Sequence, residues 1–329
     1  MNLVHKGEKR LIALTKELDC VNLISLGRSE DRHFLLMQIG VAVVIIDSHA
    51  HCSHRSFNNS FKYLSLDEQG YCIKEGDRGS LLQELFDAGI EYSIEPGVSI
   101  ERNEEVLELC REYQGRIFPS IGVHPNKAVF EKWSARKTLV AQAHSEGVVA
   151  IGEIGLDYHL KREEQHRFLQ FVWFWYQLGL AKKLNLPVML HVRDAHKDAL
   201  RILKCHSRKK YTGVIHCFNG TWDEAKQYLD LGFHLGIGGS ILQQEERASE
   251  LWEVVKHTPL ERILIETDAP YILPYCKDVI QPKLLRRARN TSMILPKVIE
   301  KIAELKGLNA AELEKQTTEN AIKLFSLHC

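Results

Sequence analysis

Residues 148–153, Val-Val-Ala-Ile-Gly-Glu, form a short apolar run that ends in a carboxylate, Glu153. An apolar run of this length is typical of a parallel strand that is buried on both faces. Similar runs recur along the chain and alternate with amphipathic stretches of helical periodicity. Strands are expected at 42–47, 91–95, 117–122, 148–153, 187–191, 214–216, 234–238 and 263–267.

The stretches between these runs carry the hydrophobic spacing of helices. Helices are expected at 79–88, 101–113, 133–146, 163–184, 195–207, 222–231, 244–256, 286–305 and 309–325. Eight strands, each followed by a helix, predict an α/β fold of the (β/α)8 TIM-barrel type. A doubly wound open sheet is the alternative, but no GxGxxG motif follows the first strand.

Two segments fall outside this repeat. Residues 1–40 form an N-terminal extension before a barrel domain at 41–329, and Leu11, Leu14 and Leu18 share one face of a possible helix there. This helix is expected either to cover the bottom of the barrel or to make a dimer contact. Residues 56–78 lengthen the loop after the first strand, either as a substrate lid or as an ordinary surface excursion.

Composition and charge exclude several classes of protein. The 329 residues are 44% hydrophobic and 26% charged, which is typical of a soluble globular protein. Lys plus Arg and Asp plus Glu number 43 each, so the chain is not a binder that holds nucleic acid by bulk charge, although a local basic site is allowed. None of the eight cysteines forms a CxxC pair, and the longest apolar run, 37–46, is too short for a membrane span. We expect reduced thiols and a cytoplasmic location.

Chemistry-bearing side chains stand where the predicted strands end. His49 and His51 are two residues apart on one strand, so they project from the same face. The carboxyl ends of barrel strands surround the active site in enzymes with this fold. Six ligand-type residues occupy these ends, and packing alone does not account for them: His49, His51, Glu153, His191, His216 and Asp268.

Four imidazoles and two carboxylates are sufficient for two divalent metal ions if one carboxylate bridges them. Imidazole favours Zn²⁺, whereas carboxylates and water also admit Mn²⁺ or Mg²⁺. A pair of such ions activates water and stabilises the oxygens of a hydrolysed ester. The pattern therefore predicts a metal-dependent hydrolase.

At these residues the sequence resembles the TatD family of metal-dependent deoxyribonucleases, within the amidohydrolase-like barrels. The resemblance covers residues 45–327. It departs from the family in the 1–40 extension, in the insertion after the first strand and at 273–282. The motifs come in the family's order: IDSHAHCS, SIGVHP, GEIGLDYH, PVMLHVRDAHKDAL, VIHCFNGT, ETDAPYI and RARNTSMILPKVIEKIAELKG.

The resemblance implies roles for the six residues. His49 and His51 would hold one metal ion with Asp268, and His191 with His216 would hold the second. Glu153 would bridge the two ions. Asp268 would also orient or deprotonate the attacking water, so Asp268 and Glu153 are the expected catalytic groups.

Four further residues are candidates for substrate binding. His124 matches the family's GxHP motif and would contact the substrate phosphate or water, or else pack at the rim. Arg193 suits bidentate phosphate binding, with a salt bridge to Asp157 or Asp194 as the alternative. Tyr158 and Asn219 lie just beyond ligand-bearing strand ends and are the remaining pocket candidates.

Three other features are more ambiguous. Cys217 follows His216 and is expected to be an inert thiol rather than a nucleophile. Residues 277–289 carry five basic residues and one acidic residue, which suits either a nucleic-acid backbone or a solvated helix face. The aromatic residues at 168–176 fall on an outer helix and are expected to serve packing or a subunit contact rather than base stacking.

The predicted activity is hydrolysis of phosphodiester bonds in DNA, of the 3′–5′ exonuclease type, on a single strand or strand end. The alternative keeps the metals and acts as an amidase, lactonase or aminoacyl-ester hydrolase, because one fold hosts many hydrolyses. A non-catalytic scaffold is a third possibility, and the intact ligand set argues against it. The sequence does not indicate an oligomeric state.

Overall fold

The computed structural model describes residues 44–159, 164–206 and 211–327. The 1–40 extension, with its amphipathic leucines, lies outside these residues, so its role stays a prediction. The described chain from Val44 onward clusters as one unit, and its architecture is the barrel that the sequence predicts.

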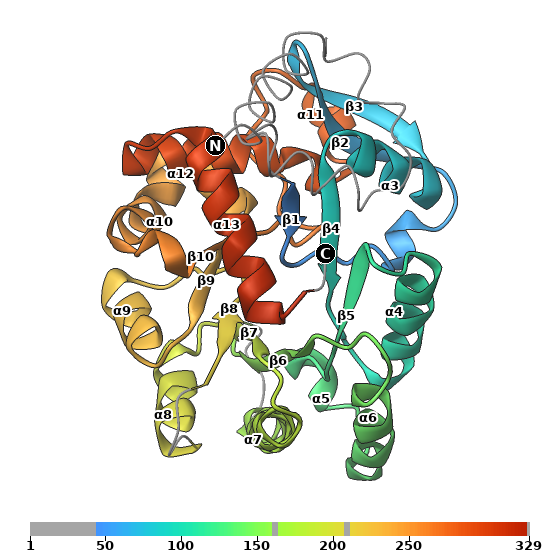
Figure 1. Cartoon of the computed structure of the whole chain (residues 1–329), viewed down its shortest axis with the longest axis vertical. Helices are drawn as coiled ribbons and strands as arrows, with labels where there is room; N and C mark the ends of the chain where they lie inside the picture. Colours follow the sequence, from blue (N-terminus) through green and yellow to red (C-terminus); the bar gives the residue numbers. More distant parts are fainter. Residues whose placement is uncertain (1–43, 160–163, 207–210, 328–329) are drawn as a thin grey trace, which may run out of the picture. The chain divides into compact units, whose positions relative to one another are not determined.

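Eight parallel strands form the barrel in the order β1-β4-β5-β6-β7-β8-β9-β10 (Figure 1). Each predicted strand is found, and most boundaries differ by one or two residues. The strand that contains Glu153 is longer than expected and continues to Asp157. The strands are β1 (Ile45–Asp47), β4 (Ile90–Glu95), β5 (Ile117–Ile121), β6 (Ala150–Asp157), β7 (Val188–Arg193), β8 (Gly213–Ile215), β9 (His234–Ile237) and β10 (Ile263–Ile265).

The first and last strands meet and bring the ring close to closure. The backbone amide of Ser48 donates to the carbonyl of Ile265 over 3.0 Å, and a parallel bridge joins Ala50 to Ala269. The buried carboxylate of Asp47 accepts from the Thr267 hydroxyl at 2.6 Å and from the Ser292 hydroxyl at 2.7 Å. This carboxylate links β1 to the segments that follow β10. Loss of either donor would leave a buried carboxylate without one of its hydrogen bonds, which is energetically costly.

Helices surround the strands, largely as predicted. The last long region is the exception: residues 286–305 were expected to be one helix, whereas its helix begins only at Leu295, with Pro296 in the first turn, where proline is favoured. The helices are α3 (Arg78–Asp87), α4 (Ile100–Glu112), α5 (Pro125–Ala128), α6 (Arg136–Ala143), α7 (Glu164–Leu184), α8 (His196–His206), α9 (Trp222–Asp230), α10 (Glu245–His257), α11 (Pro282–Leu285), α12 (Leu295–Lys306) and α13 (Ala310–Phe325).

The barrel core is apolar and is closed at the amino-terminal ends of the strands. Ile46, Ile94 and Leu264 belong to one buried cluster with Phe325, from the end of α13. Asn320, also on α13, donates to the carbonyl of Ile263 over 2.9 Å. Since this end is packed, the open end for chemistry is the opposite one, where the strands finish.

The insertion after β1 is a hairpin rather than an irregular loop. Strands β2 (Phe61–Asp67) and β3 (Gly70–Gly76) pair antiparallel (Figure 1). A two-residue strand, β11 (Ala288–Arg289), pairs with β2 as the third strand of this sheet. The carboxylate of Glu84 on α3 anchors the hairpin, because it accepts hydrogen bonds from Tyr63 at 2.7 Å and from Lys74 at 3.0 Å. No residue of 56–78 is among those that line the active-site cavity described below, and the choice between a lid and a surface excursion stays a prediction.

None of the helices in the described ranges combines the length and the apolar character that crossing a bilayer requires. The six cysteines of those ranges are free thiols.

Candidate active site

A cavity of about 830 Å³ opens at the carboxyl ends of the barrel strands. Its size falls within the range of pockets that bind small ligands. Five of the six predicted ligand residues line it, and the sixth, His49, is fully buried beside them. The five are His51, Glu153, His191, His216 and Asp268.

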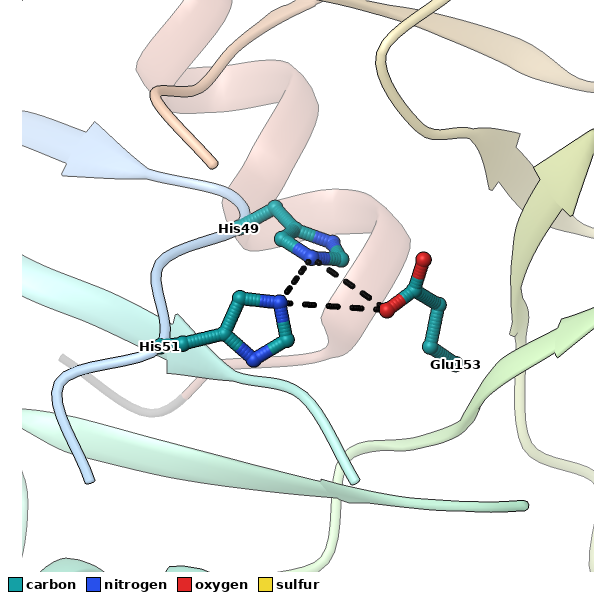
Figure 2. A group of neighbouring side chains, drawn as sticks. All are labelled: His49, His51 and Glu153. Atoms are coloured by element: carbon teal, nitrogen blue, oxygen red, sulfur yellow. Dashed lines mark hydrogen bonds and ion pairs between the residues drawn. The ribbon is translucent and has the colours of Figure 1, made fainter. Parts of the chain in front are cut away.

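On one side of the cluster, two imidazoles from the end of β1 face Glu153 across the barrel (Figure 2). The Nε2 atoms of His49 and His51 are 3.2 Å apart, and each lies 3.8 Å from Glu153 Oε2. Asp268, from the loop after β10, places Oδ1 at 3.6 Å and 3.4 Å from the same two nitrogens.

On the other side, the second oxygen of Glu153 faces three more imidazoles. Glu153 Oε1 lies 2.7 Å from His191 Nδ1 and 3.5 Å from His216 Nε2. His124 Nε2 is also 3.5 Å away. The two carboxylate oxygens of Glu153 therefore face two separate groups of imidazole nitrogen atoms.

The electrostatics keep this carboxylate ionised. Burial alone would raise the pKa of Glu153, but the imidazoles of His124, His216 and His191 hold it well below its usual range. Burial and the ring of His216, stacked at 3.5 Å between centroids, hold the pKa of His49 well below its usual range. A neutral imidazole beside an ionised carboxylate is a set of electron-pair donors suited to a divalent cation.

The spacing of the atoms fits such a cation. Four ligand atoms around one ion at about 2.0–2.1 Å lie about 3.3 Å from one another in tetrahedral geometry. The Nε2 atoms of His49 and His51 and the facing carboxylate oxygens are between 3.2 Å and 3.8 Å from their neighbours across the cluster. Three groups of residues meet this kind of spacing: His49 with His51 and Glu153, His49 with His216 and Asp268, and His124 with Glu153 and His191.

Glu266, which is not among the residues predicted for the site, orients His216. Its Oε1 accepts from His216 Nδ1 at 3.1 Å and from the backbone amide of Cys217. With Nδ1 donating to this carboxylate, the neutral form of His216 has its free electron pair on Nε2, the atom that faces the cluster. The available signal was a second carboxylate at the end of a buried strand, two residues before Asp268.

Glu95 has a similar supporting position at the end of β4. This fully buried carboxylate accepts from the amide of Cys52 at 2.6 Å and from the amide and hydroxyl of Ser53 at 3.1 Å and 2.7 Å. It fixes the turn that follows His51. It is the last residue of its strand, and a carboxylate at the carboxyl end of a barrel strand is the signal that could have identified it.

Asp157 supports the opposite side. Its Oδ2 lies 3.3 Å from His191 Nε2 and accepts from Asn126 Nδ2 at 2.7 Å. Burial opposes ionisation, but these partners hold the pKa of Asp157 well below its usual range. The backbone amide of Asn126 also donates to His124 Nδ1 over 3.0 Å. The neutral His124 ring therefore carries its proton on Nε2, the atom that faces Glu153.

Three of the four predicted substrate contacts line the cavity. His124 lies at its wall, and Asn219 places its amide oxygen 3.1 Å from His196 Nε2. Arg193 is exposed and makes no ion pair with Asp157 or Asp194 in the described part of the chain. Its guanidinium is thus available to a ligand.

Tyr158 is placed differently. Its hydroxyl donates to Asp198 over 3.1 Å, and the guanidinium of Arg167 lies 4.4 Å from its ring centre. It is not among the residues that line the cavity. Its position is that of a residue bridging β6 to α8.

Cationic side chains at the cavity come from places that the sequence did not single out. Arg55, Arg102 and Lys127 line it, whereas none of the basic residues of 277–289 does. Arg55 and Arg102 pair with Glu105. The three come from separate segments of the chain, Arg55 after β1, Arg102 in α4 and Lys127 in α5, so no local run of charge marks them in the sequence.

Two other predicted features also have defined positions. Cys217 lines the cavity, and burial raises the pKa of its thiol well above the usual value, which keeps it protonated. On α7, Trp173 and Phe174 are buried in the core, whereas Phe168 is 63% exposed and Trp175 is 40% exposed. This helix contributes no residue to the cavity.

A (β/α)8 barrel with imidazoles and carboxylates converging at the carboxyl ends of its strands defines a metal-dependent hydrolase of the amidohydrolase-like class. Residues 46–326 match the family model described as TatD related DNase, so the chain belongs to this family.

Similar proteins agree with this assignment. The "3′-5′ ssDNA/RNA exonuclease TatD" of Erwinia tasmaniensis is 37% identical over 253 residues, which are 76% of this chain and 94% of that protein. The crystal structure of YJJV, a TatD homologue from Escherichia coli, has a TM-score of 0.71 and 29% identity, covering 86% of this chain and 98% of its own. A TatD family hydrolase from Entamoeba histolytica shares the fold with a TM-score of 0.71, covering 86% of this chain and 98% of its own, at 24% identity.

Proposed function

We propose that this protein is a metal-dependent 3′–5′ exonuclease that removes nucleotides from the end of single-stranded DNA. The observation that carries the proposal is the position of Glu153, whose two oxygens face two groups of nitrogen ligands. That arrangement suits a pair of divalent ions acting on one phosphodiester. The name of the Erwinia relative supports the polarity and the single-stranded substrate.

The proposed ligand set is the one that the resemblance implies. His49, His51 and Asp268 would hold one ion, and His191 and His216 would hold the other. Glu153 would be a ligand shared by both. Zn²⁺, Mn²⁺ and Mg²⁺ are all compatible with imidazole and carboxylate ligands, so the identity of the metal is left to experiment.

When bound, divalent ions activate water and neutralise the charge that develops on the phosphate oxygens. The chain's own groups complete the chemistry around the phosphate. Asp268, partly exposed at the cavity, accepts the proton of the attacking water at a carboxylate oxygen. His124 offers its Nε2 proton to a phosphate oxygen, and Arg193 offers a bidentate donor pair.

The shape of the site favours a strand end. The cavity lies at one end of a barrel whose core is packed, so a substrate enters from the open face and stops there. A flexible single strand can bring its terminal phosphodiester to Glu153 without distortion of a duplex. We also place the protein in the cytoplasm, because the cysteines of the described ranges are free thiols.

The test uses two labelled forms of one single-stranded DNA oligomer. The protein is stripped of metal with a chelator and resupplied with Mg²⁺, Mn²⁺ or Zn²⁺. With a 5′ label we expect a ladder of progressively shorter strands, and with a 3′ label we expect early release of the labelled mononucleotide. The reverse pattern would assign 5′–3′ polarity instead. Hydrolysis of carboxylic esters without any cleavage of DNA would replace the proposal with an esterase or lactonase.

A further inference from the structure

An aromatic residue stands beside the proposed metal ligands with half of its surface exposed. Tyr271 lines the cavity, is 48% exposed, and has its ring centre 5.9 Å from that of His51. Other aromatic residues of the described chain are equally exposed, but Tyr271 also lines a cavity, where an aromatic side chain beside convergent polar groups is suited to contact a ligand.

The backbone around Tyr271 is held firmly. Its amide donates to the carbonyl of Asp268 over 2.8 Å. Asn290, which is fully buried, donates from its side chain to the carbonyl of Ile272 over 3.2 Å and from its backbone amide to Pro270 over 3.1 Å. The exposed ring is therefore presented by an ordered turn on both sides.

His54 contacts the hydroxyl end of the Tyr271 side chain, and the tautomer of His54 sets the direction of this hydrogen bond. The amide of Ser56 donates to His54 Nδ1 over 3.0 Å, so the neutral imidazole carries its proton on Nε2. That Nε2 lies 3.1 Å from the hydroxyl of Tyr271. His54 Nε2–H therefore donates a hydrogen bond to the tyrosine oxygen, and the hydroxyl hydrogen of Tyr271 stays available to a ligand in the cavity.

The unpaired cations lie on the other side of the barrel. Tyr271 and His54 follow β10 and β1, whereas Lys127 follows β5 and Arg193 ends β7, which is opposite β1 in the strand order. Neither Lys127 nor Arg193 makes an ion pair within the described residues, in contrast to Arg55. The cavity thus has Tyr271 on one side and, on strands further round the barrel, two cations without an ion pair among the described residues. Arg55 and Arg102, which also line the cavity, are already paired with Glu105.

We propose that Tyr271, oriented by His54, stacks against the terminal nucleobase of a single strand and holds it beside the proposed metal ligands. The backbone phosphates of the preceding nucleotides then extend toward Lys127 and Arg193. Base–aromatic stacking tolerates any base, because every base has a π-face, so this contact recognises the strand end rather than a sequence. The inference rests on the proposed exonuclease function and adds the residue that selects the end.

The direct test is fluorescence of 2-aminopurine, a base whose emission falls when it stacks. The full chain is freed of divalent ions so that the strand is not cut, and an oligomer with 2-aminopurine at its 3′ end is added. We expect quenching with the wild type and with Tyr271→Phe, which keeps the ring. Tyr271→Ala removes the quenching and weakens binding about tenfold or more. His54→Ala reduces the quenching, because the ring loses its orienting hydrogen bond.

Two controls make the result specific. Phe168→Ala removes an aromatic residue that is 63% exposed on α7, a helix that contributes no residue to the cavity, and leaves quenching unchanged. An oligomer with an abasic 3′ terminus binds the wild type and Tyr271→Ala equally, because the base that stacks is missing. Wild-type quenching retained in Tyr271→Ala, or equal quenching of an internal 2-aminopurine, would overturn the inference.

Cleavage assays separate this inference from the proposed function. If the wild type with metal does not shorten the oligomer, the exonuclease proposal fails. If the wild type cuts it and Tyr271→Ala cuts with the same KM, only the role of Tyr271 fails. The expected result is a raised KM for base-bearing strands in Tyr271→Ala, and no change for abasic ends.

Discussion

The carboxylate of Glu153 lies between the two groups of imidazoles and contacts both. Replacing it with glutamine keeps the shape of the side chain and removes the charge that attracts a cation. We expect Glu153→Gln to lose bound metal and to cut DNA at least about tenfold more slowly, because the proposed ions share this carboxylate. Metal content by mass spectrometry and the rate of strand shortening measure the two effects.

The control for this substitution is Glu253→Gln on the exposed surface of α10, whose carboxylate forms an ion pair with Lys256. Its metal content and rate are expected to match the wild type. A Glu153→Gln protein that is folded, retains its metal and cuts at the normal rate would disprove the assigned ligand.

Glu266 allows a graded test of a positioning role. In Glu266→Gln the amide oxygen still accepts from His216 Nδ1, whereas Glu266→Ala leaves that donor and the Cys217 amide without an acceptor. We expect metal affinity to fall about 10- to 100-fold in the alanine variant and less in the glutamine variant. Calorimetric metal titration measures the metal affinity of the wild type and of both variants. Equal affinities in all three proteins would show that the carboxylate does not orient His216.

At the scale of elements, the pairing of β9 with β10 leaves no room at Gly236. A Cβ built there would stand 2.7 Å from Cδ of Glu266, closer than real contacts allow. Gly236→Ala therefore displaces either the carboxylate or the strand. We expect a loss of about 1–3 kcal/mol in the free energy of unfolding, as in other overpacked cores. Metal affinity is expected to fall with it.

The matched control lies in the middle of α7. A Cβ at Gly179 meets only His206 Nε2, at 4.0 Å. Because alanine favours a helix over glycine, Gly179→Ala is expected to raise stability by about 0.5–1 kcal/mol and to leave metal binding unchanged. Chemical denaturation of both variants measures the contrast, and a neutral Gly236→Ala would disprove the steric argument.

At the scale of the whole molecule, His234 at the start of β9 makes stability depend on pH. Burial and the nearby Arg262 and Lys323 lower its pKa to about 4 in the folded protein, against 6.5 when exposed. Between about pH 4 and pH 6.5, His234 is therefore protonated in the unfolded chain and neutral in the folded chain. Stability is therefore lost as the pH falls from about 7 to 4, by about 2 kcal/mol from this group after allowance for partial exposure.

Unfolding curves at several pH values test this contribution. His234→Gln is expected to flatten the decline between pH 7 and pH 4, while His144→Gln, at an exposed position on the outer surface, leaves it unchanged. An unchanged decline in His234→Gln would assign the acid sensitivity to other groups.

The barrel was predictable because parallel strands buried on both faces are apolar throughout, and this signal is local. The hairpin at 61–76 was not, since its strands contain Ser65, Lys74 and other polar residues and lie among Ser and Asn. The ligand-type residues were visible as polar groups at strand ends. Their partners were harder to identify, because Lys127 and Tyr271 become neighbours of the site only when distant loops meet at one end of the barrel.

Closure of the barrel between β1 and β10 has a consequence for synthesis of the protein. His49 and His51 leave the ribosome early, but Asp268 follows them by more than 200 residues, and the hydrogen bond from Ser48 to Ile265 forms only then. A nascent chain therefore cannot assemble the complete ligand set before its last barrel strand has been translated. Any truncated product that ends before this strand has an incomplete centre, so activity reports on chains that were finished.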